Sequence, residues 1–360
     1  MTSSEADLGS ILLEWFAANK RDLPWRKTKD PYKIWLSEVI MQQTQIIQGT
    51  RYYLKFVEKY PKIEGLANAS EEEVFKLWEG LGYYSRARNM HLSAKLISKE
   101  LNGFFPEKYE EIIALKGIGK YTAAAICSIA YGSRFAVVDG NVIRLISRLK
   151  GIKEQANLAL IKKKIENYVL DLMSDNPPGI FNESIMEFGA LICKPKRPLC
   201  DICILKENCY AYEKNIVLQL PVKKNKLKIK SRFFYYNVIY TSKGVLINKR
   251  EKKDIWQGLY EFPLIEEAHE NLTIKELKTR LEISTKLMLK QLGAGDTYEQ
   301  KLTHQKVLSK FYFWQAIEPL FDANKMHNFV RLKDLNKKAF PKTIIWFLDE
   351  NTIHLNKFYN

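Results

Sequence analysis

The chain has 360 residues, of which 46% are hydrophobic, so it is long enough for two globular domains that each have a core. Its formal net charge of +16 favours a polyanionic partner, with nucleic acid ahead of an anionic membrane surface. No apolar run approaches the roughly 20 residues of a membrane-spanning helix, and residues 1–10 have the pattern of neither a secretion signal nor a transit peptide. We therefore expect a cytoplasmic protein with no membrane partner.

The first 213 residues have the pattern of an almost entirely helical domain. Helices are expected at residues 8–20, from Ile34 onward, and at 85–101, 158–173 and 184–192. Ser70 and Glu73 form a capping box at the start of a further helix, which Gly80 and Gly82 end. Apart from Phe135–Val138, no segment before residue 213 alternates as a strand does.

The segment from Leu115 to Arg144 is the centre of this domain. Gly117 and Gly119 lie between two helical patterns rather than between a strand and a helix, which argues against a dinucleotide-binding loop. Amides at the start of the following helix can hold an anion, including a backbone phosphate. A glycine-capped junction between two helices is the alternative.

Two carboxylates have contrasting surroundings. Glu38 follows Ile34 and Trp35 on an apolar helix face, so its pKa should rise and it suits a general acid; a side chain that reaches solvent is the alternative. Asp139 precedes a helix as an N-cap, where amide hydrogen bonds should keep it ionised; a cap with no other role is the alternative. Carboxylates whose pKa values are pushed apart suit cleavage of a glycosidic bond.

Aromatic and arginine side chains gather where the helices break. Trp25 and Arg26 form one such group, and Tyr83 and Arg86 belong to another in residues 82–88. Rings and guanidinium groups at such positions suit base stacking and phosphate contact. Packing aromatics beside solvated arginines are the alternative.

Four of the five cysteines form one compact run: Cys193, Cys200, Cys203 and Cys209. In a reducing compartment this clustering argues for a metal site rather than disulfides. A cubane iron–sulfur cluster is favoured over tetrahedral zinc, because zinc sites more often use two separated Cys-x2-Cys pairs. Residues 194–198 inside the run carry three cations on a proline-bounded turn, which suits a phosphate backbone.

The composition changes near residue 214. Seven basic residues and no acidic one occur between Lys214 and Arg232, which indicates an exposed linker. Beyond it, strands are expected at residues 233–240, 244–248 and 307–314, and helices at 273–281 and 334–338. The second domain should therefore be smaller and of the α+β class.

Together, the motifs resemble those of helix-hairpin-helix base-excision glycosylases that carry an iron–sulfur cluster, and more closely the MutY-type adenine DNA glycosylases. They are LPWR (23–26), SEVIMQQTQ (37–45), GLGYYSRARN (80–89), LKGIGKYTA (115–123), VDGN (138–141), FNESIMEFGA (181–190) and the four cysteines. WQGLYEFPL (256–264) and LTH (302–304) are similar to the Nudix-like recognition domain of these enzymes, although the acidic magnesium-binding helix is missing.

The resemblance implies a multidomain fold. An all-α helix-hairpin-helix catalytic domain would span residues 1–213, with a [4Fe-4S] cluster loop at 193–209. A basic linker would follow at 214–231, and an α+β Nudix-like domain would read 8-oxoguanine from residues 232–360. We expect a monomer that acts on DNA in a bacterial cytoplasm.

The resemblance also implies a substrate, namely adenine mispaired with 8-oxoguanine or guanine in double-stranded DNA, which is flipped into the helical domain. Glu38 would protonate the base, and Asp139 would stabilise or attack the sugar cation. The other matching residues are Tyr121 and Asn141 beside the acid pair; Arg26 and Glu183 at the adenine; Gln43, Thr44 and Tyr83 in the duplex; Arg86, Gly117 and Gly119 at the backbone; and Thr303 and His304 at the 8-oxoguanine. Leu302 replaces the usual phenylalanine, so a stacking ring is missing.

The residue at position 121 distinguishes this chain from the endonuclease III-like branch of the same superfamily. Endonuclease III-like enzymes place a lysine there, which forms a Schiff base and cuts the strand. Lys120 is adjacent, but it lies about 100° around the helix from Tyr121. We therefore predict a monofunctional glycosylase. A bifunctional endonuclease III-like enzyme is one alternative, and a non-catalytic iron–sulfur protein that binds DNA or transfers electrons is the other; the Glu38–Asp139 pair argues against the second.

Overall fold

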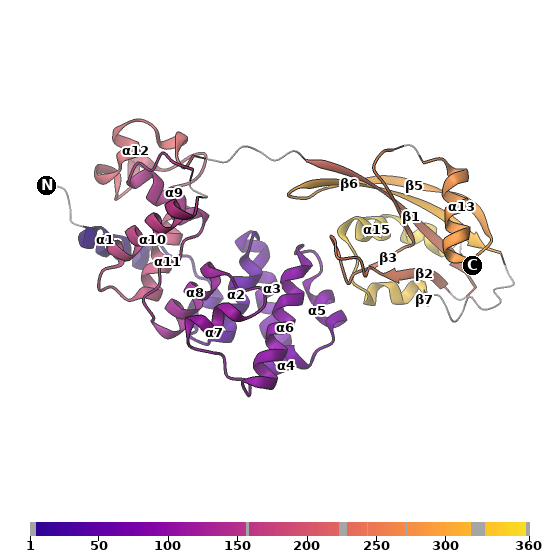
Figure 1. The fold of residues 1–360 in the computed structure, drawn as a ribbon, viewed down its shortest axis with the longest axis horizontal. Helices are drawn as coiled ribbons and strands as arrows, with labels where there is room; N and C mark the ends of the chain where they lie inside the picture. Colours follow the sequence, from indigo (N-terminus) through magenta and orange to yellow (C-terminus); the bar gives the residue numbers. More distant parts are fainter. Residues whose placement is uncertain are drawn as a thin grey trace. The chain divides into compact units, whose positions relative to one another are not determined.

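The computed structural model describes residues 5–155, 158–222, 229–242, 244–270, 272–317 and 328–357 (Figure 1). The chain divides into two compact units. The helical unit comprises Met1–Ala69 and Arg88–Asn225, and the sheet unit comprises Ser70–Ala87 and Lys226–Asn360. The domain boundaries expected from the sequence stay a prediction, and residues 223–228 of the expected linker lie outside the described residues.

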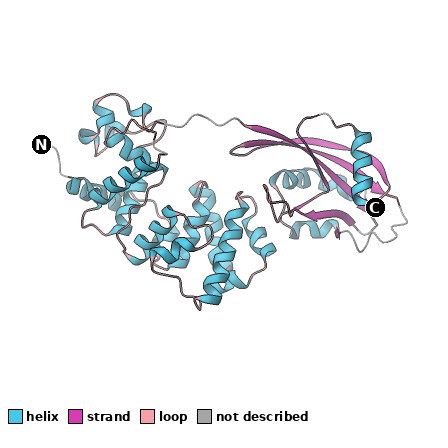
Figure 2. Ribbon diagram, viewed as in Figure 1, coloured by secondary structure: helices cyan, strands magenta, loops and turns pink. Residues whose placement is uncertain are grey.

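The chain up to residue 213 is helical, as the sequence predicts (Figure 2). Its α-helices are α1 (Glu5–Asn19), α2 (Pro31–Met41), α3 (Ile46–Lys59), α4 (Ile63–Asn68), α5 (Glu71–Trp78), α6 (Tyr84–Glu100), α7 (Tyr109–Ala114), α8 (Lys120–Tyr131), α9 (Gly140–Leu149), α10 (Ala159–Met173), α11 (Pro178–Leu191) and α12 (Tyr210–Glu213). Short 3-10 helices are η1 (Pro24–Lys27), η2 (Cys200–Ile202), η3 (Lys206–Asn208) and η4 (Val217–Gln219). No helix in the described part of the chain is long and apolar enough to cross a bilayer.

Local signals in the sequence fix several of these ends. Ser70 and Glu73 form the predicted capping box at the start of α5, in which each side chain accepts a hydrogen bond from the other residue's backbone amide. The helical stretch predicted from Ile34 is interrupted between α2 and α3, where Gln43 has a φ of 55°. Phe135–Val138 is extended but forms no strand, because the Asn182 side chain hydrogen-bonds the backbone there instead of a neighbouring strand.

Helix α11 packs closely against several other helices of the helical unit. The helix packs on α1, α8 and α9, and a large apolar core lies among α1, α9, α10 and α11. A Cβ on Gly179 would come within 2.8 Å of the Ser128 carbonyl oxygen in α8, and one on Gly189 within 2.8 Å of Asn141 Cβ in α9. Glycine at these two positions therefore permits the separations at which α8 and α9 pack against α11.

The sheet unit is built on a mixed sheet. Its strands are β1 (Lys230–Thr241), β2 (Gly244–Lys249), β3 (Tyr260–Glu261), β4 (Leu264–Glu267), β5 (Leu289–Lys301), β6 (Gln305–Ala316) and β7 (Asn328–Val330). The strand order is β3-β2-β1-β6-β5, with β4 paired to β1 and β7 to β2. Strand β1 runs parallel to β6, and the other pairs are antiparallel.

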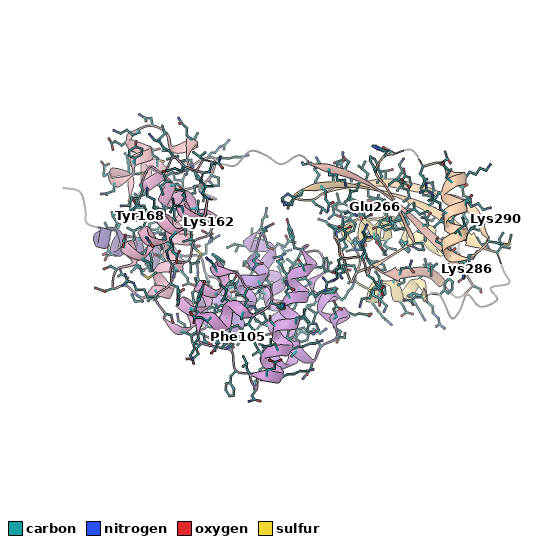
Figure 3. All side chains as sticks on the ribbon, viewed as in Figure 1. Phe105, Lys162, Tyr168, Glu266, Lys286 and Lys290 are labelled. Carbon is teal, nitrogen blue, oxygen red and sulfur yellow. The ribbon has the colours of Figure 1, made fainter. Side chains whose placement is uncertain are left out.

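Side chains of β1 alternate between the two faces of this sheet, as the period of two requires. Phe234 and Tyr236 point into a core with α15 (Lys342–Lys357), whereas Tyr235 and Ile239 point into a core with α13 (Ile274–Thr285). Figure 3 shows the side chains of both units on the ribbon. The predicted α+β class is confirmed, and the segment predicted as a helix at 334–338 is the 3-10 helix η5 (Leu332–Lys337).

Candidate active site

A helical hairpin carries one wall of the candidate site. Helices α7 and α8 are joined by a turn in which Gly117 has a φ of +81°, and a Cβ there would come within 2.7 Å of Asn89 Cβ. Gly117 is therefore required by both conformation and space. Gly119 is the N-cap of α8 in an extended conformation, and a Cβ there would meet nothing within 4 Å. Gly119 and Lys120, at this end of α8, are exposed residues.

A cavity of about 530 Å³ lies between this hairpin, α2 and the start of α9. The predicted site residues that line it are Glu38, Gln43, Gly119, Tyr121 and Asp139, joined by Met41, Gln42, Thr122, Val138, Gly140 and Ile143. The structure thus brings together an acid from α2 and an acid from the start of α9, which are about 100 residues apart in the sequence. A volume of this size is in the usual range for a small-molecule site.

Glu38 has the electrostatic setting that the sequence predicts. It lies on α2 among the buried residues Ile34 and Trp35. Burial first, and then the charges of Asp139 and Glu183, raise the pKa of Glu38 to about 7, although a hydrogen bond from Tyr121 opposes the rise. The carboxyl group is therefore partly protonated near neutral pH, as a general acid must be.

Asp139 is the N-cap of α9, as the sequence predicts. The direction of its pKa shift was not predicted. Its carboxylate accepts hydrogen bonds from the amides of Asn141 and Val142, both at 2.8 Å, and from the Asn141 side chain at 2.7 Å. Burial nevertheless raises the pKa of Asp139, and the three hydrogen bonds only oppose that rise. The N-cap hydrogen bonds therefore limit the rise of the Asp139 pKa and do not reverse it.

Tyr121 and Asn141 are held by neighbouring helices. The Tyr121 hydroxyl donates to Met186 Sδ on α11 at 3.5 Å, and its pKa is raised well above the usual value by burial and by Glu38. Asn141 Oδ1 accepts from Arg144 at 2.9 Å. Arg144 was not predicted: it is buried and also donates to the carbonyls of Gly189 and Cys193. The one feature of the sequence that could have indicated Arg144 is its position, one helical turn after the start of α9.

Residues 36–169 match the family described as HhH-GPD superfamily base excision DNA repair protein, and residues 235–350 match the NUDIX domain family. An adenine DNA glycosylase of Buchnera aphidicola subsp. Baizongia pistaciae is 34% identical over 296 residues, which cover 81% of this chain and 82% of that protein. This chain belongs to the adenine DNA glycosylase family. It is thus a DNA glycosylase of base-excision repair. The human adenine DNA glycosylase is 41% identical over 212 residues, which cover 56% of this chain and 39% of that protein.

Solved structures share the fold of the helical unit. A thermostable thymine-DNA glycosylase superposes with a TM-score of 0.54 and 31% identity, over 58% of this chain and 97% of that chain. Endonuclease III in a non-covalent DNA complex superposes with a TM-score of 0.51 and 22% identity, over 60% of this chain and 99% of that chain. At the lower identity, the likeness supports the fold alone.

Arg26 and Glu183 lie together in this glycosylase, but a residue that sequence reasoning missed dominates their surroundings. Arg26 Nε is 3.6 Å from Glu183 Oε1. Glu187, one turn further along α11, accepts hydrogen bonds from both Arg21 and Arg26. Nothing in the sequence distinguishes Glu187 from a surface glutamate of a helix. Burial raises the pKa of Glu183, although Arg26 opposes the rise.

Tyr83 lies in a strained turn of the sheet unit. The residue has a φ of 48° and is 47% exposed, and its hydroxyl hydrogen-bonds the Thr303 hydroxyl. Arg86 supports the turn: its guanidinium lies 5.0 Å from the Trp78 ring and donates to the carbonyls of residues 81 and 82. Burial lowers the pKa of Arg86 to about 10.

The hairpin turn between β5 and β6 presents Thr303 and His304, which are both exposed. Leu302 packs against the core of the sheet unit. In the helical unit, Gln43 is exposed and also has a positive φ, and Thr44 Oγ1 donates to the Gln42 carbonyl at 3.3 Å.

The four clustered cysteines line a second cavity of the helical unit, with apolar walls that include Leu145, Ile192 and Leu205. All four thiols are free of disulfides. Among the described residues, no three His, Cys, Asp or Glu side chains converge closely enough to ligate one metal ion. Cys193 Sγ accepts from the buried Arg148 at 3.3 Å. The four thiols line one apolar cavity, so they could together hold a metal-containing group there.

Proposed function

We propose that this enzyme removes adenine mispaired with 8-oxoguanine or guanine from double-stranded DNA, as a monomer and without cutting the strand. The observation that carries the proposal is the cavity that Glu38, Tyr121 and Asp139 line. A proton donor with a pKa near 7 beside a second carboxylate suits hydrolysis of an N-glycosidic bond, because the base must gain a proton and the sugar gains positive charge.

In this mechanism Glu38 donates its proton to the ring of the flipped adenine. The bond between the sugar carbon and the base nitrogen then breaks, its electron pair leaves with the protonated base, and Asp139 either stabilises the positive charge on the sugar or bonds to the sugar carbon. Asn141 holds one Asp139 oxygen, and Arg144 holds Asn141. Tyr121 would orient the acid by donating its single hydroxyl proton to the Glu38 carboxylate in place of Met186 Sδ. Water then completes the hydrolysis and leaves an abasic site.

The absence of strand cleavage follows from the side chain at position 121. A lyase needs an amine that forms a Schiff base with the sugar. Tyr121 occupies the cavity wall where such an amine would act, and a phenol whose pKa is raised well above 10 is not a nucleophile near neutral pH. The neighbouring Lys120 is exposed and does not line the cavity.

Other residues would bind the DNA. Arg26 and Glu183 would contact the adenine, and Gly117 and Gly119 would present amides to a backbone phosphate. Gln43, Thr44 and Tyr83 would enter the duplex, Arg86 would support Tyr83 near the backbone, and Thr303 with His304 would read the 8-oxoguanine. The positive φ of Gln43 and of Tyr83 supports this assignment, because such strain often persists where it serves recognition.

Cys193, Cys200, Cys203 and Cys209 would hold a [4Fe-4S] cluster. The apolar cavity between the thiols fits such a group. When bound, the cluster would cross-link residues 193–209 through iron–thiolate bonds. The basic turn at 194–198 would then be rigid where it meets the phosphate backbone.

The test is adenine release from a panel of mispaired duplexes under single-turnover conditions, with iron and zinc measured on the same sample. We expect release opposite 8-oxoguanine first and guanine second, with the strand intact. Absence of adenine release from every duplex would contradict the proposal. Release accompanied by strand cleavage and a borohydride-trapped adduct would contradict its monofunctional part.

A further inference from the structure

Glu187 is the most strongly bound carboxylate of the helical unit to which the mechanism gives no role. Its side chain is 1% exposed. It accepts from Arg21 Nε at 2.8 Å and Nη2 at 2.5 Å, and from the Arg21 amide at 2.9 Å. It also accepts from Arg26 Nη1 at 3.1 Å and Nη2 at 3.0 Å. One carboxylate therefore fixes two guanidinium groups.

These contacts set the orientation of Arg26. Both terminal nitrogens face Glu187, and Arg26 Cζ lies 5.1 Å from the centroid of the Phe16 ring. Arg26 Nε is buried and has no hydrogen-bond partner in the structure, and it lies 3.6 Å from Glu183 Oε1. Arg26 thus approaches Glu183 with its Nε edge at ion-pair distance and keeps its fork away from that carboxylate.

The alternative geometry is chemically available. A guanidinium fork binds a carboxylate through two parallel hydrogen bonds, which is its strongest pairing. Glu183 is one turn before Glu187 on the same face of α11, so it offers Arg26 a second carboxylate about 6 Å away along the helix axis. Burial raises the pKa of Glu187, but hydrogen bonds from Arg21 and Arg26 lower it to about 2. Glu187 is therefore ionised near neutral pH, and its negative charge binds the fork of Arg26.

We propose that Glu187 is a positioning residue for base recognition: it keeps the fork of Arg26 from closing on Glu183, so that the Glu183 carboxylate stays open to the amino group of the flipped base. This inference rests on the proposed function, in which adenine is the substrate and Glu183 lies at its amino edge. Arg21 also donates hydrogen bonds to Glu187, but it does not itself orient Arg26 toward the base.

The test compares Glu187→Gln with the wild type on two duplexes, one containing adenine and one containing purine, which lacks the amino group. Without the charge at residue 187, Arg26 should close on Glu183 and occupy it. We expect the preference for adenine over purine to fall about tenfold to a hundredfold, the worth of one hydrogen bond to a charged group. Glutamine keeps the shape of glutamate, so packing changes little.

The pH profile supplies a second readout, which a purely structural role would not move. Glu38 is faced by Tyr121 on α8, Asp139 at the start of α9 and Glu183 on α11, and the charge of Glu183 helps to raise the Glu38 pKa. Once Arg26 neutralises Glu183, the pH above which excision falls should move downward in Glu187→Gln.

Matched variants separate the outcomes. Arg21→Met removes the partly exposed cation but leaves Glu187 bound to Arg26, so it should keep the wild-type base preference and pH profile. Glu166→Gln, whose carboxylate pairs with Lys163 on the surface, should change neither. If Glu187→Gln does not fold, Glu187→Asp keeps the charge with a shorter reach, and an intermediate loss of preference is expected.

Equal losses on adenine and purine with an unmoved pH profile would overturn the inference and leave the proposed function intact. Unchanged preference in a folded Glu187→Gln would also overturn it. Absence of adenine release by the wild type would instead overturn the proposed function, and this inference with it.

Discussion

Two regions of the molecule bury several carboxylates and place them in opposite surroundings. In the helical unit, Glu38 lies in a cavity where its pKa is set by burial, by a tyrosine and by the carboxylates Asp139 and Glu183. In the sheet unit, two arginines meet three carboxylates at the edge of the sheet. Arg232 donates to Asp254 and to Glu266, and Arg250 donates to Asp254 and to Glu261.

The pKa directions follow from these partners. In the sheet unit, burial raises the pKa of Asp254, yet hydrogen bonds from Arg232 and a backbone amide bring it down to about 2. Glu266 is lowered for the same reason, whereas burial raises the pKa of Glu261 despite Arg250. Hydrogen bonds from arginine therefore outweigh burial at Asp254 and Glu266, and burial outweighs them at Glu261. Glu38 has no arginine partner among the causes of its shift, and burial leaves it with a pKa near 7, at which it can give a proton to a substrate.

Replacing Glu38 by glutamine should have the largest effect. The variant lacks the proton donor, so adenine excision should fall by about 10²- to 10⁴-fold, the usual contribution of a general acid. Affinity for the mispaired duplex should stay near that of the wild type, because Glu38 is assigned to proton transfer and not to anchoring. Single-turnover excision and an equilibrium binding measurement check both parts. Wild-type turnover by this variant would assign the acid elsewhere.

Arg250→Met should act on stability and not on the chemical step. Arg250 is 4% exposed, and its loss would leave Glu261 buried without its cation. Breaking a buried pair on one side costs about 3–5 kcal/mol. Calorimetry should show the sheet unit unfolding at a lower temperature, while the folded enzyme removes adenine from A:G duplexes at a rate close to wild type. A stable variant would show that Arg232 alone neutralises the three acids.

Glu38→Gln should change stability in the opposite sense. Glu38 has a raised pKa in the folded state, so it costs nothing below its ordinary pKa of about 4.5, the cost grows as the pH rises from there to about 7, and the full cost is present above about 7. The variant should gain up to about 3 kcal/mol at pH 8 and nothing at pH 4. Urea unfolding at the two pH values measures this, and an equal gain at both would point to packing rather than to charge.

Lys252→Met should have the smallest effect. Lys252 is 65% exposed and reaches Glu266 at 3.5 Å from the solvent side of the same arginine network. Exposed pairs contribute about 0–1 kcal/mol, so the unfolding temperature should barely move. A loss as large as that of Arg250→Met would mean that the network depends on total charge rather than on buried geometry.

Much of the fold could be read from local signals. The capping box at Ser70 and the N-cap at Asp139 were predicted from two or three residues, and the structure confirms both. Strand β5 was not predicted, because Gly293, Ala294 and Gly295 have low strand propensity. Its ladder with β6 from Leu289 to Lys301 is a tertiary effect, which the period of the sequence does not encode.

The candidate site was predictable where local sequence signals determine it, and not where tertiary packing does. A carboxylate on an apolar helix face predicts a raised pKa from the sequence alone, and that holds for Glu38. The sign of the Asp139 shift depends on how much surrounding structure covers the N-cap, and the sequence does not contain that quantity. Arg144 and Glu187 were missed because their importance comes from partners about 45 and 165 residues away.

The central claim is that Glu38, kept protonated by burial, gives its proton to the leaving adenine. The most direct test is the pH dependence of single-turnover adenine release from an A:8-oxoguanine duplex, measured from pH 5 to pH 9. The account predicts a rate that is high at acidic pH and falls about tenfold per pH unit as the pH rises beyond about 7, where Glu38 loses its proton. A rate that stays level through pH 9, or that rises with pH, would contradict it.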